Sequence, residues 1–107
     1  MKAIQMSKFG GPEVLKYIEV EEPTPATNEV RVRLFAAGVN PNETYIRTGT
    51  YSFYIPKLPY TPGFDGAGVV DAIGEGVRHL KIGDRVYVAA LLVKRNTGIY
   101  AQNVVCA

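Results

Sequence analysis

The sequence predicts a mainly β domain, folded as a partly open β-barrel or rolled sheet with one or two short helices. Apolar and polar residues alternate over several short stretches, which is the pattern of half-buried strands. Glycine, proline and asparagine separate these stretches, as expected for tight turns. Amphipathic helices of about 10–15 residues do not alternate with the strands, which argues against a parallel βαβ sheet.

Six stretches carry the strand pattern. They are residues 2–6, 13–21, 29–37, 66–73, 85–92 and 100–106. In the strongest one, residues 29–37, the apolar residues from Val30 to Leu34 are expected to face the core. The arginines between them face solvent. Loops are expected at residues 22–28, from their prolines, and at the polar residues 94–98.

A short helix is predicted after the third strand. Asn40 has the properties of an N-cap, Pro41 fits the first helical position, and Glu43 fits the capping-box position. The helix should end after about two turns, because Gly49 lies between two threonines at that point.

Composition excludes several classes of protein. A chain of 107 residues is expected to form one domain, residues 1–107, and its net charge of +2 without basic clusters gives no support for nucleic acid or an anionic membrane. No apolar run reaches the roughly 20 residues of a membrane span, and the first residues lack a signal-peptide pattern. With Cys106 as the single cysteine, no disulfide can form within the chain, so a reducing, cytoplasmic location is expected.

Two possible motifs are better explained structurally. The glycines of residues 63–68 run into a strand-forming pair of valines, whereas a dinucleotide fingerprint must open a helix. A tight turn with close backbone packing is the better interpretation. His79 is expected on a polar surface loop and Cys106 in a strand, far apart in the sequence, so a Cys-His hydrolase is not indicated.

Asn40, Tyr45 and Tyr51 are the candidate functional residues. A tyrosine hydroxyl donates a hydrogen bond to a carbonyl oxygen that gains negative charge during reduction, or relays a proton. Asn40 offers amide donors and an acceptor. From spacing alone, a capping asparagine and two packing tyrosines remain the alternative.

The segments VRVRLFAAGVNPNETYIRTGTY, LPYTPGFDGAGVVDAIGEGV and KIGDRVYV resemble the N-terminal half of medium-chain dehydrogenases/reductases. The most similar branch is the zinc-free quinone oxidoreductases of the zeta-crystallin type, and the resemblance covers essentially the whole chain. It implies a GroES-like distorted β-barrel, and it implies that Asn40 and Tyr45 lie beside the nicotinamide of NADPH while Tyr51 lines the substrate side. The implied reaction is reduction of a quinone or similar conjugated carbonyl.

The resemblance also implies that no metal is bound. In zinc-dependent relatives a cysteine stands at the position of Asn40 and a histidine at that of Phe64, and neither replacement is a thiolate or imidazole ligand. Gln102 departs from the glutamate that relatives usually carry there.

The family's Rossmann domain is absent from these residues, so the chain is expected to be the substrate-side domain of the enzyme, present as a fragment and inactive alone. Two alternatives stay open. One is a free-standing binding or structural module, whose exposed apolar face would be covered by self-association into a homo-oligomer. The other is an enoyl or alkenal reductase on the same scaffold.

Overall fold

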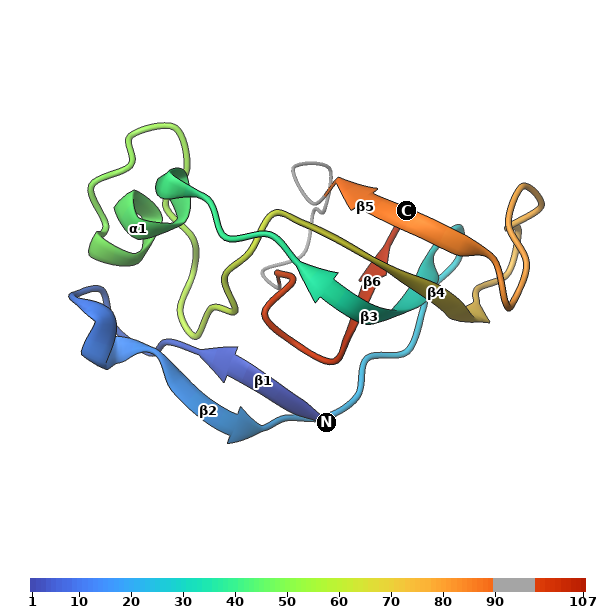
Figure 1. Cartoon of the computed structure of the whole chain (residues 1–107), viewed down its shortest axis with the longest axis horizontal. Coiled ribbons are helices and arrows are strands. Elements are labelled where there is room, and N and C mark those ends of the chain that lie inside the picture. The colour runs from blue at the N-terminus through green and yellow to red at the C-terminus, as the bar shows by residue number, and fades with distance from the viewer. Residues whose placement is uncertain (90–97) are drawn as a thin grey trace.

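The predicted mainly β fold class is confirmed (Figure 1). The computed structural model describes residues 1–89 and 98–107. Its elements are β1 (Lys2–Gln5), the 3-10 helix η1 (Pro12–Val14), β2 (Lys16–Glu19), β3 (Val30–Ala37), α1 (Pro41–Thr48), β4 (Asp65–Ile73), β5 (Arg85–Ala89) and β6 (Asn103–Cys106). Over these described residues the strands form a two-stranded and a four-stranded sheet rather than a closed barrel.

All strand pairs are antiparallel. β1 pairs with β2, and the larger sheet has the order β5-β4-β3-β6, so the predicted strongest strand is a central one. The pairing of β3 with β4 is irregular between Arg31 and Val32 and again between Leu34 and Ala36. Such irregularities bend and twist a strand. The second irregularity lies near the end of β3, just before the segment that leads to α1.

The core has two buried clusters. The first lies on the four-stranded sheet and contains Val30, Val32, Val70, Val88, Ile99 and Val104. The second lies between the N-terminal segment and α1 and contains Met6, Val14, Ile46 and Tyr60. Phe64 packs against both clusters and so connects the sheet to the helix. Burial of these side chains is the main stabilising term expected for the fold.

The short helix begins and ends where the sequence predicts. Asn40 is the N-cap in extended conformation, Pro41 is the first helical residue, and the Glu43 carboxylate accepts the backbone N–H of Asn40 at 2.7 Å as one half of a capping box. Gly49 closes the helix with φ of 79°, a left-handed conformation that glycine adopts without steric cost.

Several predicted boundaries differ from the structure. The strand expected over residues 13–21 is divided into η1 and the shorter β2, because Pro12 at the helix start and the bond from Leu15 N–H to the Pro12 carbonyl stabilise a turn first. The strand expected over residues 100–106 begins only at Asn103, since Tyr100 N–H donates to the Pro62 carbonyl instead. The predicted strand over residues 85–92 is observed to Ala89, and residues 90–97, with most of the predicted loop 94–98, lie outside the described residues.

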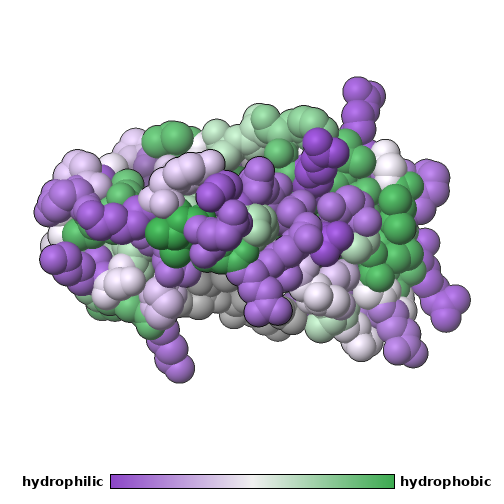
Figure 2. Space-filling view, turned by 90° about the horizontal axis from the view of Figure 1, so that it is seen from below, coloured by the Kyte–Doolittle hydropathy of each residue, from purple (hydrophilic) through white to green (hydrophobic). Residues whose placement is uncertain are grey.

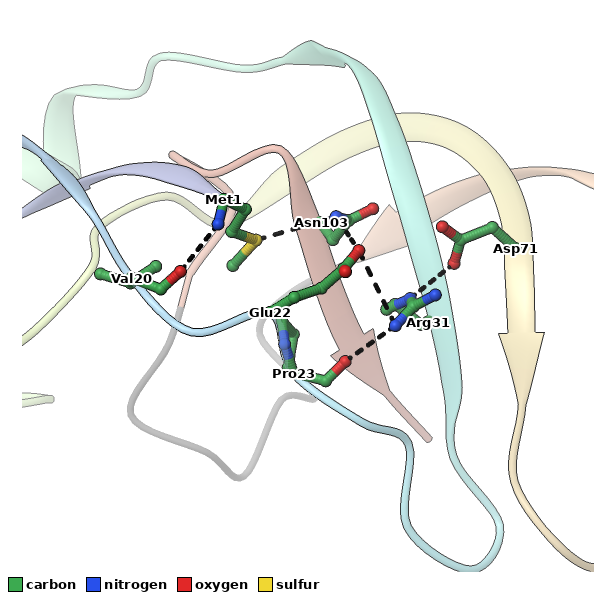
Figure 3. Close-up of polar contacts among 7 residues, drawn as sticks. All are labelled: Met1, Val20, Glu22, Pro23, Arg31, Asp71 and Asn103. Carbon is green, nitrogen blue, oxygen red and sulfur yellow. Dashed lines mark hydrogen bonds and ion pairs between the residues drawn. The ribbon is translucent and has the colours of Figure 1, made fainter.

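A polar cluster connects the loop after β2 to the four-stranded sheet (Figure 3). Arg31 on β3 donates to Asp71 on β4 at 2.8 Å and to the Pro23 carbonyl at 3.2 Å. Asn103 on β6 donates to the Glu22 carboxylate at 2.8 Å. The bond to Asp71 favours the charged guanidinium and raises the pKa of Arg31 further above its ordinary range. These bonds fix the loop against one end of the sheet, away from α1.

The face on the side of the β1–β2 hairpin carries mostly hydrophilic side chains, with hydrophobic ones in separate smaller areas (Figure 2). Among the described residues, the single α-helix is too short and too polar to cross a lipid bilayer.

Candidate functional site

Glu43, in the first turn of α1, is a buried carboxylate at the centre of the site. Only 5% of the residue is exposed, and four donors surround its two oxygens. Oε1 accepts the Asn40 backbone N–H at 2.7 Å and the Tyr100 hydroxyl at 2.6 Å. Oε2 accepts the Phe64 backbone N–H at 3.1 Å and the Asn40 side-chain amide at 3.4 Å. A buried carboxylate is tolerated when its oxygens are hydrogen-bonded in this way.

Asn40 therefore has a second role besides capping. Its Nδ2 donates to Asp65 Oδ1 at 2.6 Å, a bond that connects the start of α1 to the start of β4, 25 residues later. Hydrogen bonds to a carboxylate are shorter and stronger than those between neutral groups. The Glu43 backbone N–H donates to the Asn40 backbone carbonyl at 3.1 Å, and the Asn40 side chain faces the same N–H as the other half of the capping box.

Asp65 occupies space that Gly38 leaves open. A Cβ atom at position 38 would lie 2.5 Å from Asp65 Oδ1 and 2.7 Å from Oδ2, closer than nonbonded atoms approach. The Gly38 N–H also donates to the Asp65 backbone carbonyl at 2.7 Å. Glycine at this position thus permits the close approach of a carboxylate to the chain between β3 and α1.

Two cavities meet at Asn40. The larger, of about 430 Å³, is lined by Asn40, Pro41, Asn42, Phe64, Asp65, Tyr87 and Ala89. The smaller, of about 270 Å³, is lined by Leu15, Val39, Asn40, Glu43, Thr44, Arg47, Pro62 and Tyr100. We call the larger one the Asn40 cleft. Among its described lining residues Asp65 is the one ionisable carboxylate, and neither lysine nor arginine is present.

The tyrosines beside Glu43 are held in the neutral form. Burial, with the hydrogen bond to Glu43 as the next cause, raises the pKa of Tyr100 well above its ordinary value of 10.0. Burial also raises the pKa of Tyr60, with the nearby Tyr54 and Glu43 adding to the effect. A neutral Tyr100 is a permanent donor to the Glu43 carboxylate at physiological pH.

Of the three residues predicted for the site, Asn40 lines both cavities, whereas Tyr45 and Tyr51 line neither of them. Tyr45 lies on the solvent side of α1 and is 56% exposed. Tyr51 is half-buried against the second core cluster, and its ring centroid lies 5.5 Å from that of Phe53. The described residues thus bring Asn40 to both cavities, while Tyr45 is exposed on the helix and Tyr51 packs beside it.

Sequence reasoning missed the roles of Glu43, Asp65 and Tyr100. Glu43 was predicted only as a capping residue, and a capping glutamate in the first turn is usually exposed. Polar residues are common where a turn leads into a strand, so the sequence around Asp65 does not indicate a role in a functional site. Glu43 and Tyr100 are 57 positions apart, so no local sequence pattern reveals their contact.

The glycine-rich residues 63–68 behave as predicted for a turn. Gly63 has φ of 111°, and β4 begins at Asp65, so no helix follows these glycines. His79 is exposed, also as predicted. Within residues 1–89 and 98–107, no three histidine, cysteine, aspartate or glutamate side chains are grouped closely enough to hold a metal ion.

Residues 26–106 match the protein family described as the alcohol dehydrogenase GroES-like domain. The whole chain is also similar to proteins named quinone oxidoreductase. It is 48% identical over 108 residues to the one from Lama guanicoe, and it covers 31% of that protein. The chain therefore spans about a third of the length of the curated relatives it matches.

Solved structures agree with this similarity. The quinone oxidoreductase of Escherichia coli in complex with NADPH superposes with a TM-score of 0.82 at 37% identity, over 98% of this chain and 30% of that one. The quinone oxidoreductase of Coxiella burnetii gives a TM-score of 0.90 at 31% identity, over 100% of this chain and 34% of that one.

Proposed function

Because the chain belongs to the alcohol dehydrogenase GroES-like domain family, we propose that it forms the substrate-side domain of an NAD(P)H-dependent quinone oxidoreductase. The observation that carries the proposal is similarity along the whole chain to proteins of that name, at 48% identity for one of them. In this proposal the hydride donor binds between this domain and a cofactor-binding domain, and activity requires both.

The Asn40 cleft fits the nicotinamide end of such a cofactor. Phe64 and Tyr87 supply aromatic surface for a flat ring, and Asn40 supplies a hydrogen-bonding amide beside it. The cleft's described lining has no arginine or lysine for phosphates, and the glycines of residues 63–68 open a strand rather than a helix. The phosphates and adenine are therefore assigned to the cofactor-binding domain.

Exposed apolar side chains near α1 support contact with a further domain. Val39 is 82% exposed, Phe53 87% and Ile55 62%. Aromatic side chains such as Phe53 are enriched at protein interfaces, and the buried core of an interface is more apolar than the rest of the surface. The same exposure fits the alternative of a self-associating module, so quinone reduction in the presence of a cofactor-binding domain decides between the two.

We assign Asn40 and Tyr45 to the nicotinamide side and Tyr51 to the substrate side. The bound nicotinamide supplies the hydride. The chain's contribution is a hydrogen-bond donor at the carbonyl oxygen that becomes negative, for which a tyrosine hydroxyl is suited. The proposal assigns no zinc ion, since the pair at Asn40 and Phe64 offers a neutral amide oxygen and no thiolate or imidazole.

The experiment is a chimera in which this chain replaces the matching 30% of the Escherichia coli quinone oxidoreductase. NADPH oxidation with a quinone is expected for the chimera and not for the chain alone. Tyr45→Phe and Tyr51→Phe should each lower kcat by about 10²-fold, the size typical of one lost donor or proton relay. Tyr17→Phe is the matched control, because Tyr17 is 71% exposed on β2 and does not line the Asn40 cleft.

Three results would count against the proposal. A folded but inactive chimera would favour the non-catalytic module. NADPH turnover by the chain alone would contradict the need for a second domain. If the chimera reduces an enone faster than a quinone, the protein is an enoyl or alkenal reductase rather than a quinone oxidoreductase.

A further inference from the structure

Asn42, the second residue of α1, has a side-chain amide that forms no hydrogen bond with any residue that the structure describes. Its Oδ1 is buried without a donor, whereas its Nδ2 keeps exposed surface, and the residue lines the Asn40 cleft. A buried acceptor without a donor destabilises a fold, so such a group in a native protein requires an explanation.

Asn103 provides the comparison, because its Oδ1 is the other buried side-chain oxygen without a partner among the described residues. The amide of Asn103 has a structural reason to be present (Figure 3). Its Nδ2 donates to the Glu22 carboxylate at 2.8 Å and helps to fix the loop after β2 on the sheet. Within the described part of the chain, the amide of Asn42 has no such bond. Departures from the rules of stability are expected at functional sites.

The other polar side chains in the described lining of the cleft are already bonded or solvated. Asn40 donates to Asp65 at 2.6 Å, so these two side chains satisfy each other. Tyr87 is 70% exposed on β5, so water reaches its hydroxyl. Asn42 is therefore the partly buried group of this lining that still has N–H donors to offer to a ligand.

We infer that Asn42 is a catalytic residue of the proposed reductase, whose Nδ2 donates a hydrogen bond to the substrate carbonyl oxygen that becomes negative. This inference rests on the proposed function and deepens it, because it names a group that recognises the substrate. The quinone gains a hydride with its electron pair from NADPH and a proton from water, and its oxygen is negative between the two events. An amide donor held in place before the reaction stabilises that oxygen without giving up a proton.

The size of the cleft allows this contact. Its volume of about 430 Å³ is within the range of sites that enclose a drug-sized ligand, so a nicotinamide ring and one small quinone have room beside each other. Tyr45 and Tyr51 do not line the cleft among the described residues. Asn42 is thus a donor in addition to theirs, and it is supplied by the cleft wall itself.

The first part of the test measures the thermal stability of this chain alone. Asn42→Leu keeps the size of the side chain and removes the unpartnered oxygen, so Tm should stay equal or rise, by up to about 4–8 °C. Asn103→Leu is the matched control and should lower Tm, because Glu22 loses its donor. Leucine also favours a helix more than asparagine does, so the deciding result for Asn42→Leu is a fall.

The second part measures quinone reduction in the chimera. Asn42→Leu should lower kcat by about 10²-fold, the loss typical of one donor to a developing oxyanion, and should leave KM for NADPH within about twofold. Asn42→Ser retains a hydroxyl donor and should be about tenfold faster than Asn42→Leu. Asn103→Leu should keep the kcat of the unaltered chimera, since Asn103 does not line the cleft.

A lower Tm for Asn42→Leu in the chain alone overturns the inference, because the amide would then serve the fold, and this result does not depend on the chimera. An active chimera whose kcat is unchanged by Asn42→Leu overturns the inference and leaves the proposed function standing. A loss that appears in KM for NADPH rather than in kcat overturns the assignment to the substrate. An unaltered chimera that does not reduce a quinone overturns the proposed function and the inference together.

Discussion

Tyr100 donates its hydroxyl hydrogen to Glu43 Oε1 across 2.6 Å, between residues that are 57 positions apart in the sequence. The bond joins the segment before β6 to the first turn of α1. Because Glu43 also accepts the backbone N–H of Phe64, the carboxylate connects the helix to two other segments at once. The position of Asn40 beside the cleft depends on this connection.

Replacing Tyr100 with phenylalanine should destabilise the chain by about 1–3 kcal/mol, because one oxygen of a buried carboxylate loses a donor. Urea unfolding followed by circular dichroism measures this change. Tyr17→Phe, on the exposed face of β2, should stay within about 0.5 kcal/mol of the unaltered chain. Equal stabilities for the two variants would mean that the Tyr100 bond contributes nothing to folding.

Replacing Glu43 with alanine should lower the free energy of unfolding by about 3 kcal/mol or more, which is a larger loss than for Tyr100→Phe. The reason is that the Tyr100 hydroxyl and the Phe64 N–H both lose their acceptor. Adding Tyr100→Phe to Glu43→Ala should then lower the free energy of unfolding only a little further, because the hydrogen bond between the two residues is already lost. A double-mutant cycle with a coupling energy of about 0.5–3 kcal/mol is expected for residues in direct contact. Strict additivity of the two effects would show that the groups do not interact.

Three buried or partly buried tyrosines should ionise only at a higher pH than a free tyrosine. Burial raises the pKa of Tyr54, Tyr60 and Tyr100 above the ordinary value of 10.0, the last with help from its bond to Glu43. Absorbance at alkaline pH should therefore report fewer ionised tyrosines in the folded chain than the seven in the sequence, with the rest appearing on unfolding.

A raised folded-state pKa favours the neutral hydroxyl in the folded chain. The stability from these groups is therefore fully present below about pH 10 and is lost as the pH rises through their folded values. Stability that increases above pH 10 would contradict the burial of Tyr60 and Tyr100.

The strands and α1 were predictable because their signals are local. The alternation from Val30 to Leu34 fixes which face of β3 is buried, and Asn40, Pro41 and Gly49 give the helix boundaries. The short η1 was missed since residues 13–21 also alternate, and the turn-forming effect of Pro12 at their start prevailed.

The candidate site was predictable only in part. Asn40 was found because it fits an N-cap and its amide offers both donors and an acceptor, yet the carboxylates that bind its amide lie at positions 43 and 65 and meet only in the folded chain. A capping glutamate and an aspartate at a strand start look ordinary in a sequence. Tyr45 and Tyr51 stay predictions, because their assigned roles depend on a cofactor-binding domain that faces them.

Cys106 should react slowly with alkylating reagents in the folded chain. Its side chain is half-buried against the first core cluster, and β6 holds it opposite Val30. Burial, with Glu29 as a smaller cause, raises the pKa of the thiol above its ordinary value of 9.0, and the thiolate is the reactive form. At pH 8 iodoacetamide should therefore modify the folded chain several-fold more slowly than the chain in urea, as followed by intact mass.

Cys106→Ala should abolish the modification, since no other cysteine exists. Because the folded state favours the neutral thiol, the associated stability is present below the unfolded pKa and is lost as the pH rises through the folded pKa. Equal rates of modification in the folded and unfolded chain would place Cys106 in solvent and contradict its packing on the sheet.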